Sequence, residues 1–336
     1  MEEALKRQNE LEMSLENREV GVVVFETTVC VVVGVSAFLG NVLLCFSLYK
    51  TPGFRAPQNY YIMCLAVTDM LFAVLCMPFF VGTLIKGKWI FGDTFCQVQG
   101  SFIFILVNAS LFTMALIAVN RFFKMTKAGK LYRRIYSKRN ISLSILLVWT
   151  VSFTLVGAVF SFGSQVFRFH PGKFLCFLDM THSQGVRWFS IAAYVMVSAV
   201  VFPVMIICYV QVYRKVRAHF AEIAISGHVR QASRSFVNEA KITKMLFVTL
   251  VAFLVCWTPA IITDVFEAFY GQYSLPRQAY FWQIITFASS SAVNPIIYGF
   301  MRQELRMAYK DVLTCKRWLR SLLWQWAELL KSLKLT

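Results

Sequence analysis

This sequence is short of charged side chains. Only 15% of its 336 residues are charged and 58% are hydrophobic, whereas a soluble domain has about 25% charged and 45–50% apolar residues. The apolar residues stand in long runs that a water-exposed surface could not absorb, which excludes the soluble, disordered and disulfide-rich secreted classes. The runs are continuous and not alternating, so an outer-membrane barrel is disfavoured as well. The composition predicts an integral membrane protein with several spans.

Acidic residues are scarcer than basic ones, 17 against 34, which gives a net charge of +17. Such an excess can indicate nucleic-acid binding, but here the basic residues lie in the connectors between the apolar runs. We therefore exclude nucleic acid as a partner. We expect the charge to set membrane topology and to attract anionic membrane lipids of the inner leaflet.

A secretory signal is also lacking, because residues 1–19 contain six glutamates and no apolar core. Seven later runs reach the roughly 20 helical residues that cross a bilayer, and only helices satisfy their own backbone there. We expect the first run to insert as a signal anchor. The predicted spans are 28–49, 59–84, 96–123, 141–163, 189–213, 243–269 and 279–300.

The predicted fold is an all-α membrane protein, a seven-transmembrane helix bundle with an amphipathic helix after the seventh span. With the N-terminus outside, 25 of the 34 Lys and Arg fall on the cytoplasmic side and nine outside, as the positive-inside rule requires. We expect a multi-pass plasma-membrane protein with an extracellular N-terminus. The expected segments are 1–27 outside the cell, 28–300 as the bundle, 301–315 as a membrane-surface helix, and 316–336 as a cytoplasmic amphipathic tail that lies on the membrane or docks a partner.

Two of the nine cysteines stand on the outer side in this topology. Cys96 opens the third span and Cys176 lies in the loop after the fourth. The oxidising environment there favours a disulfide between them, with two free thiols as the alternative. Cys315 follows the seventh span on the inner side and is a candidate for palmitoylation.

Ionisable residues are nearly absent from the spans. No histidine lies in any of them, which argues against an intramembrane zinc hydrolase and a proton-relay transporter. No repeat relates the two halves, which argues against an inverted-repeat transporter. Asp69 is the only acid deep in a span, where it could hold a sodium ion or belong to a hydrated network that only packs helices. Its candidate neighbours are Asn41, Ser110, Ser290, Ser291 and Asn294.

A basic and an acidic residue mark the cytoplasmic edge of two spans. Arg121 ends the third span and Glu239 begins the sixth, so an ion pair between them could clamp two helices and act as a switch. The alternative is that Arg121 only marks the membrane boundary. Pro259 in the sixth span and Pro295 in the seventh each remove one backbone hydrogen bond and predict a kink. Together these features predict a mobile bundle.

The chain contains a series of short motifs, about one in each span. Taken in sequence order, they make residues 25–315 resemble a class A (rhodopsin-like) G protein-coupled receptor. Within that class the chain most resembles the melatonin-receptor and opsin-related branch. The motifs are Gly40-Asn41, Leu65 to Asp69, Trp89 to Gly92, Cys96 with Cys176, Asn120-Arg121-Phe122, Trp149, Glu239 to Lys244, Cys256 to Pro259, and Asn294 to Tyr298.

The resemblance implies an extracellular ligand bound above Trp257 and a heterotrimeric G protein at the inner end. Arg121 would part from Glu239 as the sixth span swings outward, and Tyr209 and Tyr298 would stabilise the open form. Arrestin and a receptor kinase are further implied partners. The implied switch residues are Asn120, Arg121, Glu239, Tyr209, Asn294, Pro295 and Tyr298. The implied sodium site consists of Asp69, Ser110, Ser290, Ser291 and Asn294.

Two departures from the family pattern bear on the mechanism. Asn120 stands where the family has an acid before the arginine, so the resting clamp depends on Glu239 alone, which favours higher basal activity. Pro203 stands two residues later than the family's proline in the fifth span. This displacement leaves the family's bulge there, and its contact with Phe253, without support.

The resemblance also limits the class of ligand at two positions. Ile103 stands where amine receptors have an aspartate, so we do not expect an amine held by a salt bridge. Ala288 stands where opsins have their lysine, so we expect no retinal Schiff base, and no cofactor beyond a possible sodium ion. The expected pocket is apolar and suits a neutral lipophilic small molecule or the apolar end of a peptide. Its residues are Phe79, Ile103, Phe104, Val107, Asn108, Trp257, Ala260, Ile261, Asp264, Tyr280 and Ile284.

The predicted function is therefore a ligand-activated receptor coupled to G proteins. A peptide-binding receptor of the same family and a non-signalling seven-helix decoy or scaffold are the alternatives. A decoy would have lost the inner switch, whereas Arg121, Glu239 and Tyr298 are all present. No nucleophile–base pair is evident in the spans, so we do not expect an enzyme.

Overall fold

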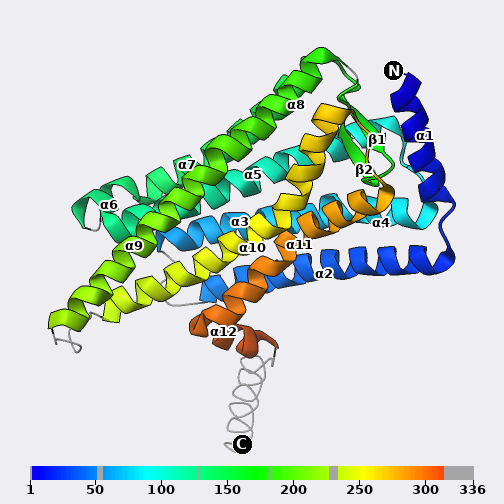
Figure 1. Ribbon diagram of the computed structural model, residues 1–336. Coiled ribbons are helices and arrows are strands. Elements are labelled where there is room, and N and C mark those ends of the chain that lie inside the picture. Colours follow the sequence, from blue (N-terminus) through cyan, green and yellow to red (C-terminus); the bar gives the residue numbers. More distant parts are fainter. Residues whose placement is uncertain (1, 51–55, 128, 182, 227–233, 314–336) are drawn as a thin grey trace, which may run out of the picture.

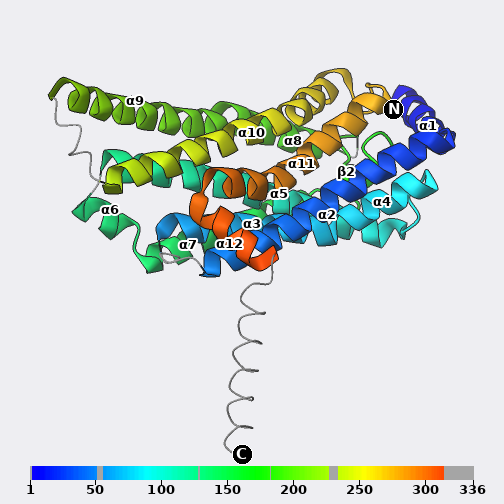
Figure 2. The same cartoon turned by 90° about the horizontal axis from the view of Figure 1, so that it is seen from below.

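The computed structural model describes residues 2–50, 56–127, 129–181, 183–226 and 234–313. Within these residues, seven helices are long and apolar enough to cross a membrane. They lie side by side in one elongated bundle (Figures 1 and 2). The predicted all-α seven-helix bundle is confirmed.

The helices and strands follow one another without a second domain among the described residues. The second and fifth spans are each broken into parts near a proline. The elements are α1 (Glu2–Glu16), α2 (Val20–Lys50), α3 (Pro57–Leu75), α4 (Met77–Lys86), α5 (Gly92–Thr126), α6 (Lys130–Ile135), α7 (Lys138–Phe160), β1 (Phe167–His170), β2 (Leu175–Leu178), α8 (Gln184–Met196), the π-helical turn η1 (Val197–Val201), α9 (Phe202–Ser226), α10 (Arg234–Tyr270), α11 (Arg277–Met301) and α12 (Gln303–Leu313).

The first of these breaks lies between α3 and α4, within the second of the seven membrane spans, and it follows from Pro78. A proline cannot donate a backbone hydrogen bond, and it occupies the start of α4, where that donor is not needed. The helix therefore restarts at Met77, after Cys76. Because of this restart, the side of α4 that faces the bundle differs from the side that a continuous helix would place there.

The break in the fifth span is the π-helical turn Val197–Val201, directly before Pro203. A π turn accommodates one extra residue in a helix, so the displaced proline is compatible with a bulge after all. Val201 and Phe253 both belong to the same buried cluster. The sequence offered no support for this bulge, and the structure contains it.

The first span begins at Val20, earlier than the predicted residue 28, and it is preceded by a helix that the sequence did not predict. That helix, α1, is polar overall, but Leu11 and Leu15 lie four residues apart on one face and are buried. Leu11 packs with Tyr273 and Tyr280. Within the segment predicted as the extracellular N-terminus, 1–27, the helix Glu2–Glu16 is therefore packed on the bundle, and the residues from Val20 onward belong to the first span.

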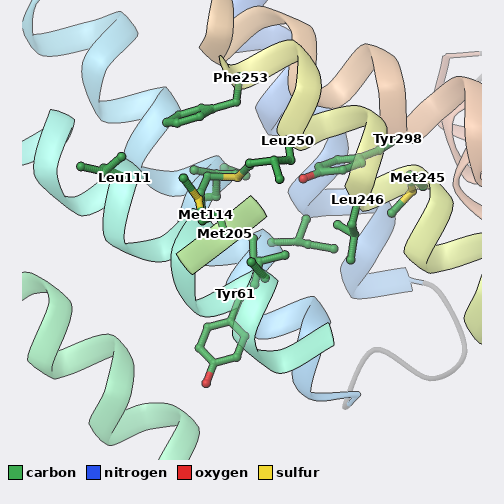
Figure 3. Close-up of a cluster of buried hydrophobic side chains, with 14 of the residues drawn as sticks. Tyr61, Leu111, Met114, Met205, Met245, Leu246, Leu250, Phe253 and Tyr298 are labelled. Atoms are coloured by element: carbon green, nitrogen blue, oxygen red, sulfur yellow. The ribbon is translucent and has the colours of Figure 1, made fainter. Parts of the chain in front are cut away.

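The core of the bundle is a cluster of buried apolar side chains contributed by all seven spans (Figure 3). The labelled side chains of Leu111, Met114, Met205, Phe253 and Tyr298 point toward one another from α5, α9, α10 and α11. Large apolar side chains also cover the outside of the bundle, for example Leu146, Leu147 and Val255. Such an exterior is stable only against lipid.

A two-stranded hairpin covers one end of the bundle. Its strands β1 and β2 are antiparallel, with Phe169 opposite Cys176. Cys176 forms the predicted disulfide with Cys96 at the start of α5, with the Cα atoms 5.3 Å apart. We call the end that carries α1 and this hairpin the hairpin end, and the opposite end, which carries α6, the Arg121 end (Figure 1).

The helix after the last span, α12, is anchored by Leu305, which is fully buried. The Tyr309 hydroxyl donates a hydrogen bond to the Pro295 carbonyl oxygen over 3.2 Å. Residues 303–313 are thus helical, as predicted for the segment 301–315. Cys315 and the predicted tail 316–336 lie outside the described residues.

Candidate functional site

A cavity of about 140 Å³ lies in the half of the bundle nearer the hairpin. Its walls are mostly apolar, and Asp264 is the only acidic residue among the described residues that line it. Nine of the eleven residues predicted for the pocket line this cavity. They are Ile103, Phe104, Val107, Asn108, Trp257, Ala260, Ile261, Asp264 and Ile284.

The other two predicted residues lie elsewhere. Phe79 packs against Trp89 and Phe91, and its neighbour Phe80 lines the cavity instead. Phe79 does not line this cavity, because α4 restarts at Met77 and faces the bundle with a different side. Tyr280 is fully buried beside the cavity but donates its hydroxyl to Glu267 over 2.7 Å, so it does not line the wall.

The hairpin supplies part of the cavity wall that sequence reasoning missed. Phe167, Leu175, Phe177 and Leu178 all line the cavity. A signal for them existed in the predicted disulfide, because fixing Cys176 to the start of α5 places its two neighbours over the bundle. The hairpin therefore closes the cavity at this end.

A cluster of buried charges joins the hairpin to α10. Lys173, in the turn between β1 and β2, is fully buried. Its Nζ donates hydrogen bonds to Asp264 Oδ1 over 2.8 Å and to Glu267 Oε2 over 2.6 Å. Both acids stand near the end of α10, and the sequence gave no indication of their partner. Burial alone would lower the pKa of Lys173, but the two carboxylates outweigh it and raise that pKa above its usual value.

His170 completes this cluster. Its Nε2 lies 3.0 Å from Glu267 Oε1, and its Nδ1 accepts a hydrogen bond from the backbone N–H of Lys173. Accepting that bond requires an unprotonated Nδ1, so Nε2 carries the proton and donates it to Glu267. Burial lowers the pKa of His170, against the opposing effect of Glu267. The histidine is thus neutral in the folded protein near pH 7.

Close packing holds the turn of the hairpin in this place. Gly172 lies against the ring of Tyr280, and a Cβ atom at that position would collide with the ring. The His170 ring packs on Tyr273 and Tyr280, with ring centroids 4.6 and 4.8 Å away. The hairpin end is therefore fixed by packing as well as by charge.

A second buried ion-pair group ties the connector between α1 and α2, and α2 itself, to α11. Glu26 accepts hydrogen bonds from Arg18 and from Arg277, each over 2.6 Å. All three side chains are at most 5% exposed. This group lies at the same end of the bundle as the hairpin.

The polar residues predicted around Asp69 are only partly brought together. Ser291 donates to Asp69 Oδ1 over 2.7 Å, and Asn294 donates to Asp69 Oδ2 over 3.0 Å. Asn41 reaches the Ser291 carbonyl oxygen. Ser110 and Ser290 do not contact the carboxylate in this way: they line a small void of about 10 Å³ beside Ser291 and Trp257. The oxygen atoms present are of the type that sodium prefers, so they fit such an ion.

Trp257 lies between these two regions, since it lines both the cavity and the small void. Its ring packs on Phe253 and Phe287, with centroid distances of 4.7 and 5.2 Å. It stands two residues before Pro259, the proline inside α10. A change in the cavity wall at Trp257 therefore acts on the segment of α10 next to the proline.

At the Arg121 end, Arg121 and Glu239 form the ion pair that the sequence predicted as a clamp. Arg121 Nη1 lies 3.0 Å from Glu239 Oε2; the arginine side chain is fully buried and the glutamate is 22% exposed. Lys124 lies 3.6 Å from the other carboxylate oxygen. Asn120 contacts Arg121 and donates to the Tyr132 hydroxyl over 3.3 Å.

The two tyrosines assigned to the switch lie within the core cluster. Tyr209 and Tyr298 are both buried there, and the Tyr209 hydroxyl has no hydrogen-bond partner among the described residues. Both tyrosines thus belong to the packed core between α5, α9, α10 and α11.

Comparisons with known proteins agree with this arrangement. A family model described as 7 transmembrane receptor (rhodopsin family) matches residues 40–298. The crystal structure of squid rhodopsin superimposes with a TM-score of 0.74 at 22% identity, covering 89% of this chain and 88% of that chain. That likeness establishes a shared fold.

Curated relatives differ in what their names say they bind. The allatostatin-A receptor of Bombyx mori is 28% identical, covering 84% of this chain and 78% of the relative. The melatonin receptor type 1C of Gallus gallus is 26% identical, covering 83% and 79%. The histamine H2 receptor of Rattus norvegicus is 24% identical, covering 82% and 76%.

Proposed function

Because the chain belongs to the rhodopsin family of seven-transmembrane receptors, we propose that it binds a neutral lipophilic small molecule in the cavity beside Trp257 and activates a heterotrimeric G protein. The observation that carries this proposal is the state of Asp264. It is the only acid among the described residues that line the cavity, and Lys173 already neutralises it at 2.8 Å. The remaining wall is apolar and aromatic, which suits a ligand without charge.

The proposed activation runs along α10. A ligand in contact with Trp257 biases the helix at Pro259, where the missing backbone hydrogen bond allows bending. The far part of α10 then moves, and the pair between Arg121 and Glu239 opens at the Arg121 end. A cleft formed there would receive the G protein.

Sodium at Asp69 belongs to the resting state in this proposal. Asp69 would hold the ion together with hydroxyl oxygens of Ser110, Ser290 and Ser291, next to Trp257. Movement of Trp257 on activation would close that space.

The proposed orientation puts the hairpin end outside the cell and the Arg121 end in the cytoplasm of the plasma membrane. The distribution of Lys and Arg supports it. Arrestin and a receptor kinase are proposed as further cytoplasmic partners, since members of this family that signal through G proteins require shut-off.

The similarity to the allatostatin-A receptor favours a peptide ligand as the second candidate. The hairpin wall and the docked helix α1 oppose it, because a peptide would have to displace Phe177 or Leu178 to reach the cavity. An amine ligand, as named for the histamine H2 receptor, has no free acid to pair with in this cavity.

The test is G protein activation in cells that express the chain at their surface. Basal and stimulated activation are measured with neutral indoles, lipids and extracted peptides, beside Arg121→Ala and the control Lys124→Ala. We expect one neutral class to stimulate the wild type and Lys124→Ala, and Arg121→Ala to be silent. Equal activation with and without Arg121 would refute the switch role of Arg121, and failure of the purified protein to bind any nucleotide-free G protein would refute signalling. Activation by peptides alone would refute the ligand class.

A further inference from the structure

The side chain of Lys173 occupies a place with the chemistry of an ammonium-binding site. Its Nζ lies 2.8 Å from Asp264 Oδ1 and 4.1 Å from the centroid of the Phe177 ring. A carboxylate and an aromatic face are the two groups by which proteins hold organic ammonium ions. Asp264 and Phe177 both line the cavity, so here the chain's own lysine fills that place.

The two carboxylates of the cluster depend on Lys173 to different degrees. Glu267 also accepts hydrogen bonds from Tyr280, from the backbone N–H of Tyr273 and from His170. Asp264 has one other donor in the described part of the chain, the amide of Gln283, at 3.0 Å. Without Lys173, the group left short of a partner would therefore be Asp264, which faces the cavity.

We propose that Lys173 is a specificity-determining residue: it acts as an internal cation that occupies the ammonium position at Asp264 and so prevents amines from binding in the cavity. The inference rests on the proposed function and extends it, because it names the feature that separates this cavity from an amine-binding one. It makes the ligand preference reversible by one substitution. The ligand class admitted after removal of the lysine is a primary arylalkylamine.

The position of Lys173 explains why the loss of charge would open a site and not only a void. Methionine in its place would keep most of the aliphatic length and remove the ammonium group. The vacated volume would lie between Asp264 and the ring of Phe177. A primary amine entering from the cavity would restore both contacts.

The experiment compares two probes of the same shape on purified full-length protein. 2-Phenylethylamine carries the ammonium group and 2-phenylethanol does not, and binding is read from the rise in unfolding temperature with probe concentration. The variants are Lys173→Met, Lys173→Arg as the charge-preserving control, and Lys173→Met with Asp264→Asn. This measurement needs no G protein, so it can fail or succeed independently of the proposed signalling.

We expect Lys173→Met to bind the amine about 10- to 100-fold more tightly than the wild type does, the range expected of a hydrogen bond to a charged group, with the alcohol unchanged. Lys173→Arg and the double variant are expected to behave like the wild type. Equal amine binding by wild type and Lys173→Met, or by Lys173→Met and the double variant, would overturn the proposal.

If Lys173→Met does not fold, because two buried carboxylates then face each other without a cation, a second variant is used. Lys173→Met with Glu267→Gln leaves Asp264 as the single acid of the cluster. We expect this variant to be stabilised by 2-phenylethylamine and not by 2-phenylethanol. If it is stabilised equally by both probes, Lys173 does not determine specificity. If the wild type does not signal in cells while these variants still select the amine over the alcohol, only the proposed signalling function is refuted.

Discussion

The two ends of the bundle are held by ion pairs that differ in burial and in number. At the hairpin end, Lys173 sits between two carboxylates, with the side chains of Lys173 and Glu267 fully buried. At the Arg121 end, one arginine faces one carboxylate that is 22% exposed. The hairpin end also has a disulfide, which has no counterpart among the described residues at the other end.

This difference assigns the two ends different roles. Breaking the fully buried pair leaves both charges without solvent and is costly, whereas at the Arg121 end the partly exposed Glu239 regains water when it parts from the buried Arg121. In the proposed activation, the hairpin end therefore stays closed and the Arg121 end opens. A receptor that transmits a signal along α10 needs one fixed end and one movable end.

The largest effect is expected from removing the covalent link at the hairpin end. Cys176→Ser frees β2 from α5, and closure of a loop with a sequence separation of 80 residues contributes about 4 kcal/mol. We expect a much lower unfolding temperature and poor surface expression. Cys256→Ser, at a free and half-buried thiol, serves as the control. Equal unfolding temperatures for the two variants would show that the hairpin is held without the disulfide.

The next effect tests the buried charges. Glu267→Gln removes one of the two anions around Lys173. It also weakens the hydrogen bonds that the side chain at position 267 forms with His170 and Tyr280. We expect a loss of about 2 kcal/mol or more in the free energy of unfolding, with little change in basal G protein activation. Thermal unfolding of purified protein measures it, with Glu16→Gln, an exposed residue 3.8 Å from Lys88, as the matched control. A rise in basal activity with no loss of stability would reverse the roles assigned to the two ends.

The third effect lies at the Arg121 end. Glu239→Gln removes the anion that faces Arg121, and Asn120 cannot replace it because it is uncharged. We expect basal G protein activation to rise about fivefold, because a partly exposed ion pair contributes ~1 kcal/mol to the resting state. The unfolding temperature should be almost unchanged. Lys124→Gln, which weakens only the longer contact of 3.6 Å, should raise it less. An unchanged basal rate in Glu239→Gln would mean that this pair does not hold the resting state.

Features that repeat along a helix, or that occur once in each span, could be predicted from the sequence. Continuous apolar runs predicted all seven spans, and Ile103 and Val107, both predicted for the pocket, stand four residues apart on one wall of the cavity. Topology alone suggested the pairing of Cys96 with Cys176. The Arg121–Glu239 pair was foreseeable because both residues had to lie at the same membrane edge.

What the sequence could not predict depends on segments without periodicity. Lys173 lies in a turn, and nothing in its neighbours indicates that a lysine there is buried against α10. The helix α1 has a polar composition, and only its contact with Tyr273 and Tyr280 gives Leu11 a reason to be buried. Phe80 lines the cavity in place of Phe79 because the break at Cys76 changes which face of α4 meets the bundle.

The smallest effect is expected from pH at the hairpin end. His170 is faced by Glu267 and Asp264 of α10, by Tyr273, by Tyr280 of α11 and by Lys173 of its own turn. Since burial lowers its pKa from the usual 6.5, the unfolded state takes up the proton first as the pH falls. Stability is therefore unaffected by this group above about pH 6.5 and declines between that value and the lowered pKa of the folded state.

A protonated Nδ1 could no longer accept the backbone hydrogen bond of Lys173, so acid should loosen the turn that carries the lysine. Unfolding temperatures at about pH 7.5 and 5.5 are compared for the wild type, His170→Gln and the control His219→Gln, whose histidine lies on α9. We expect the acid-induced decrease to be smaller in His170→Gln than in the other two proteins. The same decrease in all three would place the acid sensitivity of the hairpin end in its carboxylates, and the contrast between the two ends would then depend on Asp264 and Glu267 alone.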